Sequence, residues 1–280
     1  MELTLKKQLK KTAVNIRMNI IEGTYNAGSG HPGGSLSCTD ILTYLYFNKM
    51  NVDSNDPMKE NRDRFVLSKG HAAPALYGAL AEKGYFPKEE IKTLRKIDSN
   101  LQGHPDMNKT PGVDISTGSL GIGLSNACGM ALSSKLKGID NRIYVVCGDG
   151  EIQEGQIWEA AMFASHYKLD KLTLFVDANT LQIDGKTADV MSVEPIDKRF
   201  ESFGWYAQRI NGHDFDQIEE AVLNAEKVTG KPSVIVCDTV KGKGVSFMED
   251  KAGWHGVAPK KDEYELAMSE LKAQLEALED

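Results

Sequence analysis

The segment Ile143-Tyr144-Val145-Val146-Cys147-Gly148-Asp149-Gly150 is a short apolar run that ends in a glycine-rich turn. A helical pattern follows over residues 153–167, and a second apolar run, Leu172 to Val176, leads into Asp177-Ala178-Asn179. This succession predicts one strand–helix–strand unit. We expect its two strands to be parallel and to be joined by a right-handed crossover.

Polar side chains follow the ends of both predicted strands. Ligands of parallel sheets bind beyond the carboxyl ends of the strands, so we expect Asp149 and Asn179 to converge on one point. A carboxylate and an amide oxygen suit a hard divalent cation such as Mg2+ or Ca2+. The glycines at 148 and 150 permit a tight turn and a close approach of the backbone to a phosphate. Gly-Asp-Gly alone is typical of an ordinary strand-end turn, and it is the paired Asn179 that favours a binding site.

The composition is that of a globular protein without marked affinity for nucleic acid or membranes. The chain of 280 residues has 41% hydrophobic and 26% charged residues, and its net charge of −7 disfavours nonspecific binding to nucleic acid. No apolar run is long enough to span a membrane, and the first residues lack the apolar core of a secretory signal. Cysteines without metal-ligand spacing, two of which (Cys147 and Cys237) end apolar strands, predict buried free thiols and a cytoplasmic protein.

Strand and helix patterns alternate along the rest of the chain. Strands are expected at residues 64–68, 206–210 and 233–237, and helices at 4–26, 37–48, 72–83, 87–96, 124–136, 195–203, 214–227 and 261–278. The alternation predicts an α/β fold with a mostly parallel sheet flanked by helices. Because no linker interrupts the pattern, we expect one domain over residues 1–280.

Two glycine-rich stretches are predicted as loops, at residues 26–34 and 115–123. The second opens a helix of small residues. The N-terminus of such a helix has free N–H groups and a positive dipole end, so we expect it to receive an anion.

Four of the six histidines stand beside glycine or proline in predicted loops: His31, His71, His104 and His255. A single loop histidine is usually not functional, but four of them at helix starts and strand ends suggest a shared site. Imidazole changes its charge near neutral pH, which suits proton transfer to sugar hydroxyls. The histidines lack the spacing of zinc ligands, and no cysteine joins them.

Short motifs follow one another along nearly the whole chain. They are Ser29-Gly30-His31-Pro32-Gly33, Ser68-Lys69-Gly70-His71-Ala72, Gly103-His104-Pro105, Thr117-Gly118-Ser119-Leu120-Gly121, the Gly148–Asn179 unit, Lys241-Gly242-Lys243-Gly244 and His255-Gly256. Their order is that of transketolases, so the chain resembles the N-terminal, diphosphate-binding domain of this family of thiamine diphosphate (ThDP) enzymes. One departure is Ser119, where many members of the family carry proline.

The resemblance implies a role for each matching residue. Asp149, Asn179 and the backbone carbonyl of Leu181 would hold the metal, Mg2+ or Ca2+. His31, His71, His104 and His255 would be catalytic and take part in proton transfer. His31 and His104 would bind substrate hydroxyls, and His71 and His255 would contact cofactor phosphates or reacting oxygens. The cofactor would be contacted by Gly118, Ser119, Leu120, Asp149, Gly150, Glu154, Asn179, Lys241, His71 and His255. Glu154 would also join a carboxylate network at the subunit interface, with Glu159 as a further candidate.

The resemblance also implies a function and a partner. A transketolase of the pentose phosphate pathway transfers a two-carbon ketol unit from a ketose phosphate to an aldose phosphate. In this family a second domain supplies the glutamate against the aminopyrimidine ring and the arginines for substrate phosphate, and no motif of that domain is found here. We therefore expect a separate C-terminal, pyrimidine-binding subunit to complete the site in an α2β2 heterotetramer.

Two other functions stay open at this point. One is a related ThDP enzyme, such as a 1-deoxyxylulose-5-phosphate synthase or the transketolase of a specialised sugar-acid pathway; the synthase usually has both domains in one longer chain, and it uses pyruvate. The other is a non-catalytic binding module, which would be indicated by failure to bind ThDP with Mg2+.

Overall fold

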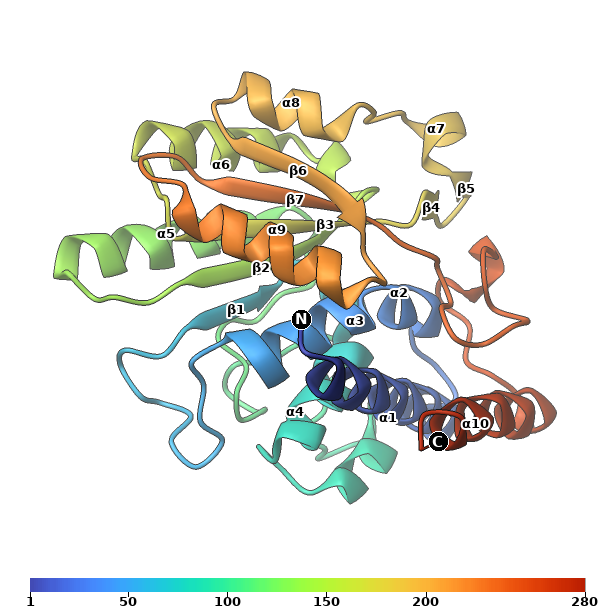
Figure 1. Cartoon of the computed structure of the whole chain (residues 1–280). Coiled ribbons are helices and arrows are strands. Elements are labelled where there is room, and N and C mark those ends of the chain that lie inside the picture. Colours follow the sequence, from blue (N-terminus) through green and yellow to red (C-terminus); the bar gives the residue numbers. More distant parts are fainter. Residues whose placement is uncertain (280) are drawn as a thin grey trace.

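The structure is a computed structural model that describes residues 1–279. Within these residues, five parallel strands form the central sheet in the order β1-β2-β3-β7-β6 (Figure 1). The strands are β1 (Arg64–Leu67), β2 (Ile143–Gly148), β3 (Leu172–Ala178), β6 (Tyr206–Asn211) and β7 (Ser233–Asp238), and a short antiparallel pair, β4 (Leu181–Gln182) and β5 (Gly185–Lys186), lies apart. The α/β fold with a parallel sheet is therefore confirmed.

The three central strands end level with one another. The register pairs Gly148 of β2 with Asp177 of β3, and Asp177 with Cys237 of β7. Their residues are almost all apolar because helices cover both faces of the sheet. The residues that follow the strands therefore come together at one edge of the sheet.

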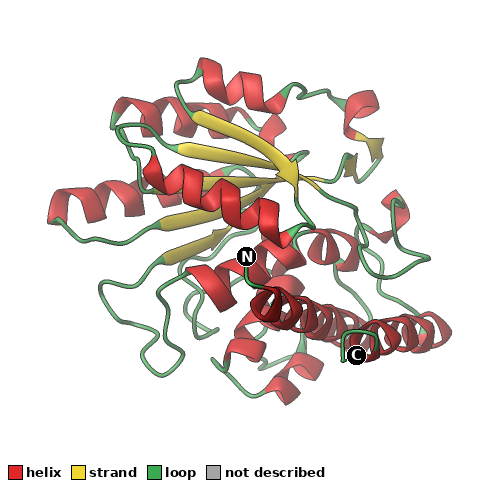
Figure 2. Cartoon of the chain, in the orientation of Figure 1, coloured by secondary structure: helices red, strands yellow, loops and turns green. Residues whose placement is uncertain are grey.

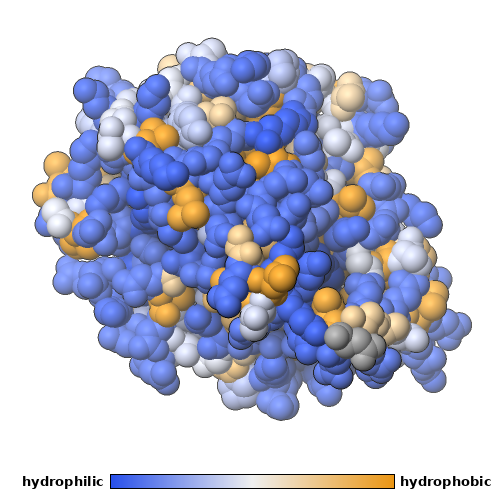
Figure 3. All heavy atoms as spheres, viewed as in Figure 1, coloured by the Kyte–Doolittle hydropathy of each residue, from blue (hydrophilic) through white to orange (hydrophobic). Residues whose placement is uncertain are grey.

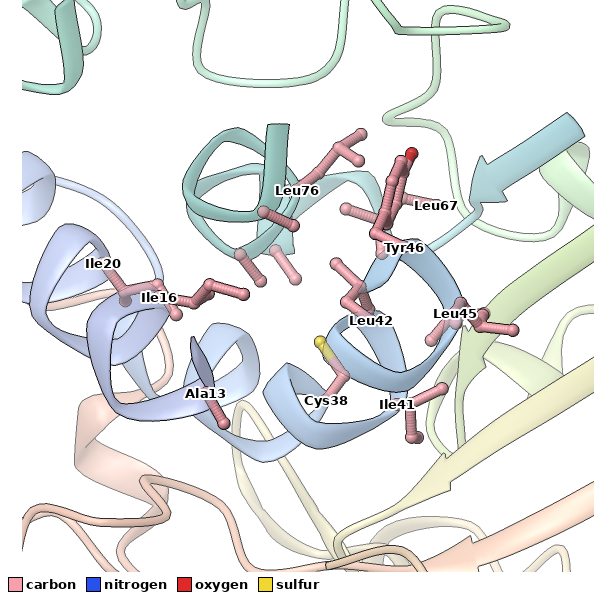
Figure 4. Packing of buried hydrophobic residues seen from close by; sticks show 14 of the residues in the cluster. Ala13, Ile16, Ile20, Cys38, Ile41, Leu42, Leu45, Tyr46, Leu67 and Leu76 are labelled. Atoms are coloured by element: carbon pink, nitrogen blue, oxygen red, sulfur yellow. The ribbon is translucent and has the colours of Figure 1, made fainter. Parts of the chain in front are cut away.

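Helices cover the two faces as separate layers (Figure 2). One layer holds α5 (Ile122–Lys137), α6 (Gly155–His166) and α8 (Ile196–Ser202); the other holds α1 (Leu3–Ala27), α3 (Thr39–Tyr44), α4 (Ala73–Lys83) and α9 (Phe215–Lys227), with α10 (Lys261–Glu276) beside α1. Successive strand residues alternate between the two cores, with Val145 in one and Val146 in the other. Figure 4 shows the core under α1, where Ile16, Leu42 and Leu76 gather.

The chain crosses the sheet in one direction and then turns back. The step from β1 to β2 passes through α4 of one layer before α5 of the other. The steps from β2 to β3 and from β3 to β6 use α6 and α8, whereas the return from β6 to β7 uses α9 on the opposite face. Right-handed crossovers require this change of face when the direction reverses. Beyond β3 the chain continues to α8 on one face, whereas beyond β7 it continues through Val245 and Met248 into the other core. The neighbouring strands β3 and β7 are thus left toward opposite faces, and such a point forms a ligand crevice in open parallel sheets.

Two predicted segments differ from the structure. The run at 26–34 is not a loop throughout, because α2 (Pro32–Ser37) begins inside it. In place of the single helix predicted over 37–48, α2 is followed by α3 and by a π-helical turn at Leu45–Lys49. Proline suits the first turn of a helix, and complete burial of α2 outweighs the low helix propensity of its glycines. The predicted helix at 87–96 is only a 3-10 segment, Lys88–Thr93, because the chain turns at Arg95, whose φ is 59°.

The surface seen in Figure 3 is mostly hydrophilic, with small apolar patches. No helix within residues 1–279 is long and apolar enough to cross a membrane. The cysteines Cys38, Cys128, Cys147 and Cys237 are buried free thiols, as expected for the two that end strands. The edge strand β6 carries Arg209, which pairs with Glu194 at 2.9 Å and with Asp238 at 2.7 Å.

The close packing of α5 against the end of β1 leads to a stability prediction. A Cβ on Gly123 would lie 2.7 Å from Cα of Ser68 and closer still to its Oγ. We predict that Gly123→Ala lowers the free energy of unfolding by about 2 kcal/mol, because α5 must move away from the sheet or become strained. Urea denaturation of the full chain measures this change.

A second glycine of α5 provides the matched control. A Cβ on the exposed Gly129 would meet no atom within 4 Å. Gly129→Ala should therefore raise the free energy of unfolding by about 0.5–1 kcal/mol through helix propensity. If both variants changed stability in the same direction, the contact at Gly123 would not be the cause.

Candidate active site

A cavity of about 400 Å3 opens at the carboxyl ends of the strands. Most of the site residues predicted from the sequence line it: His31, His71, Gly118, Leu120, Asp149, Gly150, Glu154, Asn179, Leu181, Lys241 and His255. They come from seven separate segments of the chain. The fold therefore brings together what the motifs predicted as one site.

Three of the predicted residues do not line this cavity. His104 lies just behind the lining, since a Cβ on Gly118 would be 3.2 Å from its ring. Ser119 is exposed between Gly118 and Leu120. Glu159 is exposed on α6, as is Glu154 just before that helix, so both carboxylates face outward.

The predicted metal ligands are held by the backbone around them. Asp149 accepts hydrogen bonds from the N–H of Thr180 at 2.7 Å and of Gly150 at 2.9 Å, which join the ends of β2 and β3. Burial, and then the nearby Asp177, raise the pKa of Asp149 to about 6. Oδ1 of Asn179 accepts the N–H of Leu181 at 3.2 Å. This gives a carboxylate, an amide oxygen and a carbonyl oxygen, which are donors for a hard cation.

No group of three His, Cys, Asp and Glu side chains that could hold a metal occurs within residues 1–279. That finding does not conflict with the predicted ligand set, which contains only one such side chain, Asp149. The donors here are oxygens, so they fit Mg2+ or Ca2+ better than a transition metal.

Two buried lysines give the cavity positive charge. Lys69 and Lys241 are 1% and 2% exposed and line the cavity. Burial, and then the charge of Lys69, lower the pKa of Lys241 to about 8. Nζ of Lys241 donates at 3.1 Å to the carbonyl of Leu181, which is itself one of the predicted metal ligands. Cationic groups next to oxygen ligands fit a metal-bound diphosphate.

Three histidine rings form a cluster on one side of the cavity. The ring centroids of His31, His71 and His255 lie 5.1–5.5 Å from one another. Burial lowers the pKa of each: that of His31 to about 4, with Arg95 as the next cause, and that of His255 to about 3, with Lys241 as the next cause. The pKa of His71 is well below its usual value, for the same first reason. All three are therefore neutral near pH 7.

Hydrogen bonds fix which nitrogen of two rings carries the proton. Nη2 of Arg95 lies 3.4 Å from Nδ1 of His31, and Nζ of Lys241 lies 2.9 Å from Nδ1 of His255. Guanidinium and ammonium groups only donate, so both Nδ1 atoms accept. His31 and His255 thus carry their protons on Nε2.

Some residues of the site were not assigned a role from the sequence, although they lie within or beside its motifs. Glu151 is buried and accepts hydrogen bonds from Ser68 Oγ at 2.5 Å and from the N–H groups of Gly121 and Gly148 at 3.0 Å. The anion at the start of α5 is therefore supplied by the chain itself. Lys69 and Asp177 were missed as well, because their partners are distant in sequence.

Comparisons with known proteins agree with this geometry. Residues 8–276 match the family model for the transketolase, thiamine diphosphate binding domain. The chain is 47% identical to the 6-deoxy-6-sulfo-D-fructose transketolase subunit SqwG from Clostridium sp. (strain MSTE9), over 95% of this chain and 97% of that protein. It is 44% identical to an apulose-4-phosphate transketolase subunit from Actinobacillus succinogenes, over 95% of this chain and 96% of that protein.

Solved structures show the same fold. A transketolase from Campylobacter jejuni superposes with a TM-score of 0.89 at 31% identity. The match covers 99% of this chain but 46% of that one, so the chain spans about half the length of this solved transketolase.

The low pKa of His31 leads to a prediction about stability and pH. Between the ordinary pKa of 6.5 and the folded value of about 4, the unfolded chain binds a proton at His31 and the folded chain does not, so this side chain lowers stability as pH falls. As the pH falls from 7.5 to 5, the free energy of unfolding of His31→Gln should therefore rise relative to that of wild type. After allowance for solvent screening, we expect this relative gain to be on the order of 1 kcal/mol.

Urea denaturation of the full chain at both pH values measures the difference. His166→Gln, which replaces an exposed histidine at the end of α6, controls for the general effect of removing a histidine. A His31 variant whose stability relative to wild type stayed constant with pH would show that burial does not hold this imidazole neutral.

Proposed function

Because the chain belongs to the transketolase family, in the part that binds thiamine diphosphate, we propose that it is the N-terminal subunit of a split transketolase. It would transfer a two-carbon ketol unit from a ketose phosphate to an aldose phosphate, with ThDP and Mg2+ or Ca2+. The main support is one juxtaposition: the oxygen donors of Asp149, Asn179 and Leu181 share a cavity with Lys241 and the neutral histidine cluster.

The chain's own residues would bind and orient the cofactor. Asp149, Asn179 and the carbonyl of Leu181 would hold the cation, while Gly150 and Lys241 would contact the diphosphate. Gly118, Ser119 and Leu120 would line the thiazolium face, where Leu120 is 38% exposed and free to make an apolar contact. The bound cofactor supplies the carbon nucleophile of the reaction.

The histidines would bind substrate oxygens and take part in proton transfer there. His31 and His255 present Nε2–H groups, which can donate to a sugar hydroxyl or carbonyl oxygen. Their low pKa values keep both rings neutral, so each Nε2–H would act as a hydrogen-bond donor to the reacting oxygen. His71 and His104 would assist, and burial lowers the pKa of both.

The rest of the enzyme would come from a partner. We propose that residues 1–280 form one domain and that a C-terminal, pyrimidine-binding subunit completes the site in a cytoplasmic α2β2 heterotetramer of the pentose phosphate pathway. The exposed carboxylates of Glu154 and Glu159 would lie at the interface. Two relatives, matched over 97% and 96% of their own length, are named as transketolase subunits, which supports this division.

A specialised sugar substrate is the second candidate. The two relatives matched over their full length are named for 6-deoxy-6-sulfo-D-fructose and for apulose 4-phosphate. Parallel assays of the assembled enzyme with fructose 6-phosphate and with each of these sugars would decide between the candidates.

The metal assignment leads to a binding prediction. Asp149→Asn should weaken Mg2+-dependent ThDP binding at least about tenfold, because it removes the only carboxylate from the ligand set. Calorimetric titration of the full chain with ThDP, with Mg2+ or with a chelator, measures this. Asp184→Asn is the matched control, since Asp184 lines the same cavity outside the ligand set and its replacement should have little effect. Unchanged affinity of the Asp149 variant would refute the metal assignment.

The need for a partner leads to an activity prediction. The chain alone should bind ThDP with Mg2+ but transfer no ketol unit, because no residue assigned here contacts the aminopyrimidine ring. Gentle purification from its own cells should recover a second subunit, and the pair should convert a ketose phosphate and an aldose phosphate to new sugars detectable by mass spectrometry. Full activity of the chain alone would refute the split-enzyme proposal.

A further inference from the structure

Asp177, near the end of β3, is a fully buried carboxylate with four hydrogen-bond donors around it. Its Oδ2 accepts from Ser37 Oγ at 2.5 Å, from Lys69 Nζ at 2.5 Å and from Asn179 Nδ2 at 3.1 Å. Its Oδ1 accepts from Thr239 Oγ1 at 2.5 Å. These donors belong to α2 and to the segments that follow β1, β3 and β7. One side chain therefore joins four of the segments that meet at the cavity.

Lys69 is the counter-ion of this carboxylate. Its Nζ also donates to the carbonyl of Gly34 at 2.7 Å, and its side chain is 2% exposed. Burial alone would lower the pKa of Lys69 and raise that of Asp177, but each charge overcomes this effect, so the pKa of Lys69 is raised and that of Asp177 lowered. Both groups are charged. A buried ion pair is seldom needed for stability, since an apolar pair often serves as well, so its place beside the cavity suggests a role there.

The pair decides which end of the Asn179 side chain faces the cavity. The amide nitrogen donates to Asp177 and, at 3.3 Å, to Ser37 Oγ. A carboxylate can only accept hydrogen bonds, so the amide cannot turn round without placing Oδ1 against Asp177. Oδ1 therefore points the other way, where it accepts the N–H of Leu181.

The same carboxylate is linked to α2, which starts directly after His31. Ser37 of α2 bonds Asp177, and the Gly34 carbonyl of α2 bonds Lys69. Gly33 of α2 in turn accepts the N–H of Gly242, next to Lys241, at 3.0 Å. The position of α2 is thus tied to Asp177 on one side and to the Lys241 segment on the other.

We propose that Asp177, charge-balanced by Lys69, is a positioning residue that holds Oδ1 of Asn179 toward the bound cation and aligns α2 with the metal site. It is not itself a metal ligand. This inference rests on the proposed function, because the cation at Asn179 belongs to it. The group positioned is a neutral oxygen ligand, so the cation affected is a hard divalent one bound together with ThDP.

The test measures cation affinity in the full chain, with Mn2+ as the probe in the presence of ThDP, by electron paramagnetic resonance. Replacing Asp177 alone would leave Lys69 as an uncompensated buried charge, so the test variant is Lys69→Met/Asp177→Leu. We expect it to fold, with an unchanged circular dichroism spectrum, and to bind Mn2+ about ten- to a hundredfold more weakly.

Three further variants separate positioning from general damage. Lys69→Met/Asp177→Asn keeps an acceptor for the Asn179 amide and should retain more Mn2+ affinity than the leucine variant. Ser37→Ala, which changes no charge and keeps the test available if the double variants fail to fold, should weaken Mn2+ binding about two- to tenfold. Arg62→Met/Asp114→Leu removes another buried ion pair, at 2.5 Å, before β1 at the far end of the sheet, and should leave Mn2+ affinity unchanged.

The outcomes distinguish the inference from the function beneath it. Wild-type Mn2+ affinity in the folded leucine variant, or in Ser37→Ala, would overturn the positioning role while leaving the proposed function intact. Equal losses in the leucine variant and the Arg62/Asp114 control would also overturn it, because the effect would then be general. Failure of the wild-type chain to bind ThDP with Mn2+ would overturn the proposed function, and this inference with it.

Discussion

The hydrogen-bond register of the central strands is the constraint on which the rest of this structure depends. Because Gly148, Asp177 and Cys237 are paired across β2, β3 and β7, the residues just beyond them meet at one edge. Shifting one strand by a single residue would turn its side chains to the opposite face and separate Asp149 from Asn179. The two apolar cores prevent such a shift, since each strand residue belongs to one core or the other.

Burial sets the charge state of the groups gathered at that edge. Imidazoles that would be partly protonated in water are held neutral, while Lys69 keeps its charge because Asp177 compensates it. The cavity therefore separates two tasks. The charge of Lys241, which pairs with no carboxylate within residues 1–279, attracts an anion, and uncharged rings stay available for protons.

The sequence predicted the elements whose signal is local. The central strands were found because they are almost uniformly apolar, and the helix expected over 214–227 is observed as α9 (Phe215–Lys227). The helix α2 was missed because its stability comes from burial rather than from propensity. The Lys69–Asp177 pair was also missed, because the partners are 108 residues apart and only the folded sheet brings them together. The order of the motifs located most of the cavity lining, and two of these motifs contain Lys69 and Asp177, but motif order does not show that the two side chains meet.

The outer edge of the sheet at β6 has a consequence for how larger assemblies can form. Arg209 forms ion pairs there with Glu194 and Asp238, so the edge carries a compact group of charges. A second chain that added a strand at this edge would have to bring its backbone against these charges and remove their water, which disfavours fibril growth and strand-exchanged dimers.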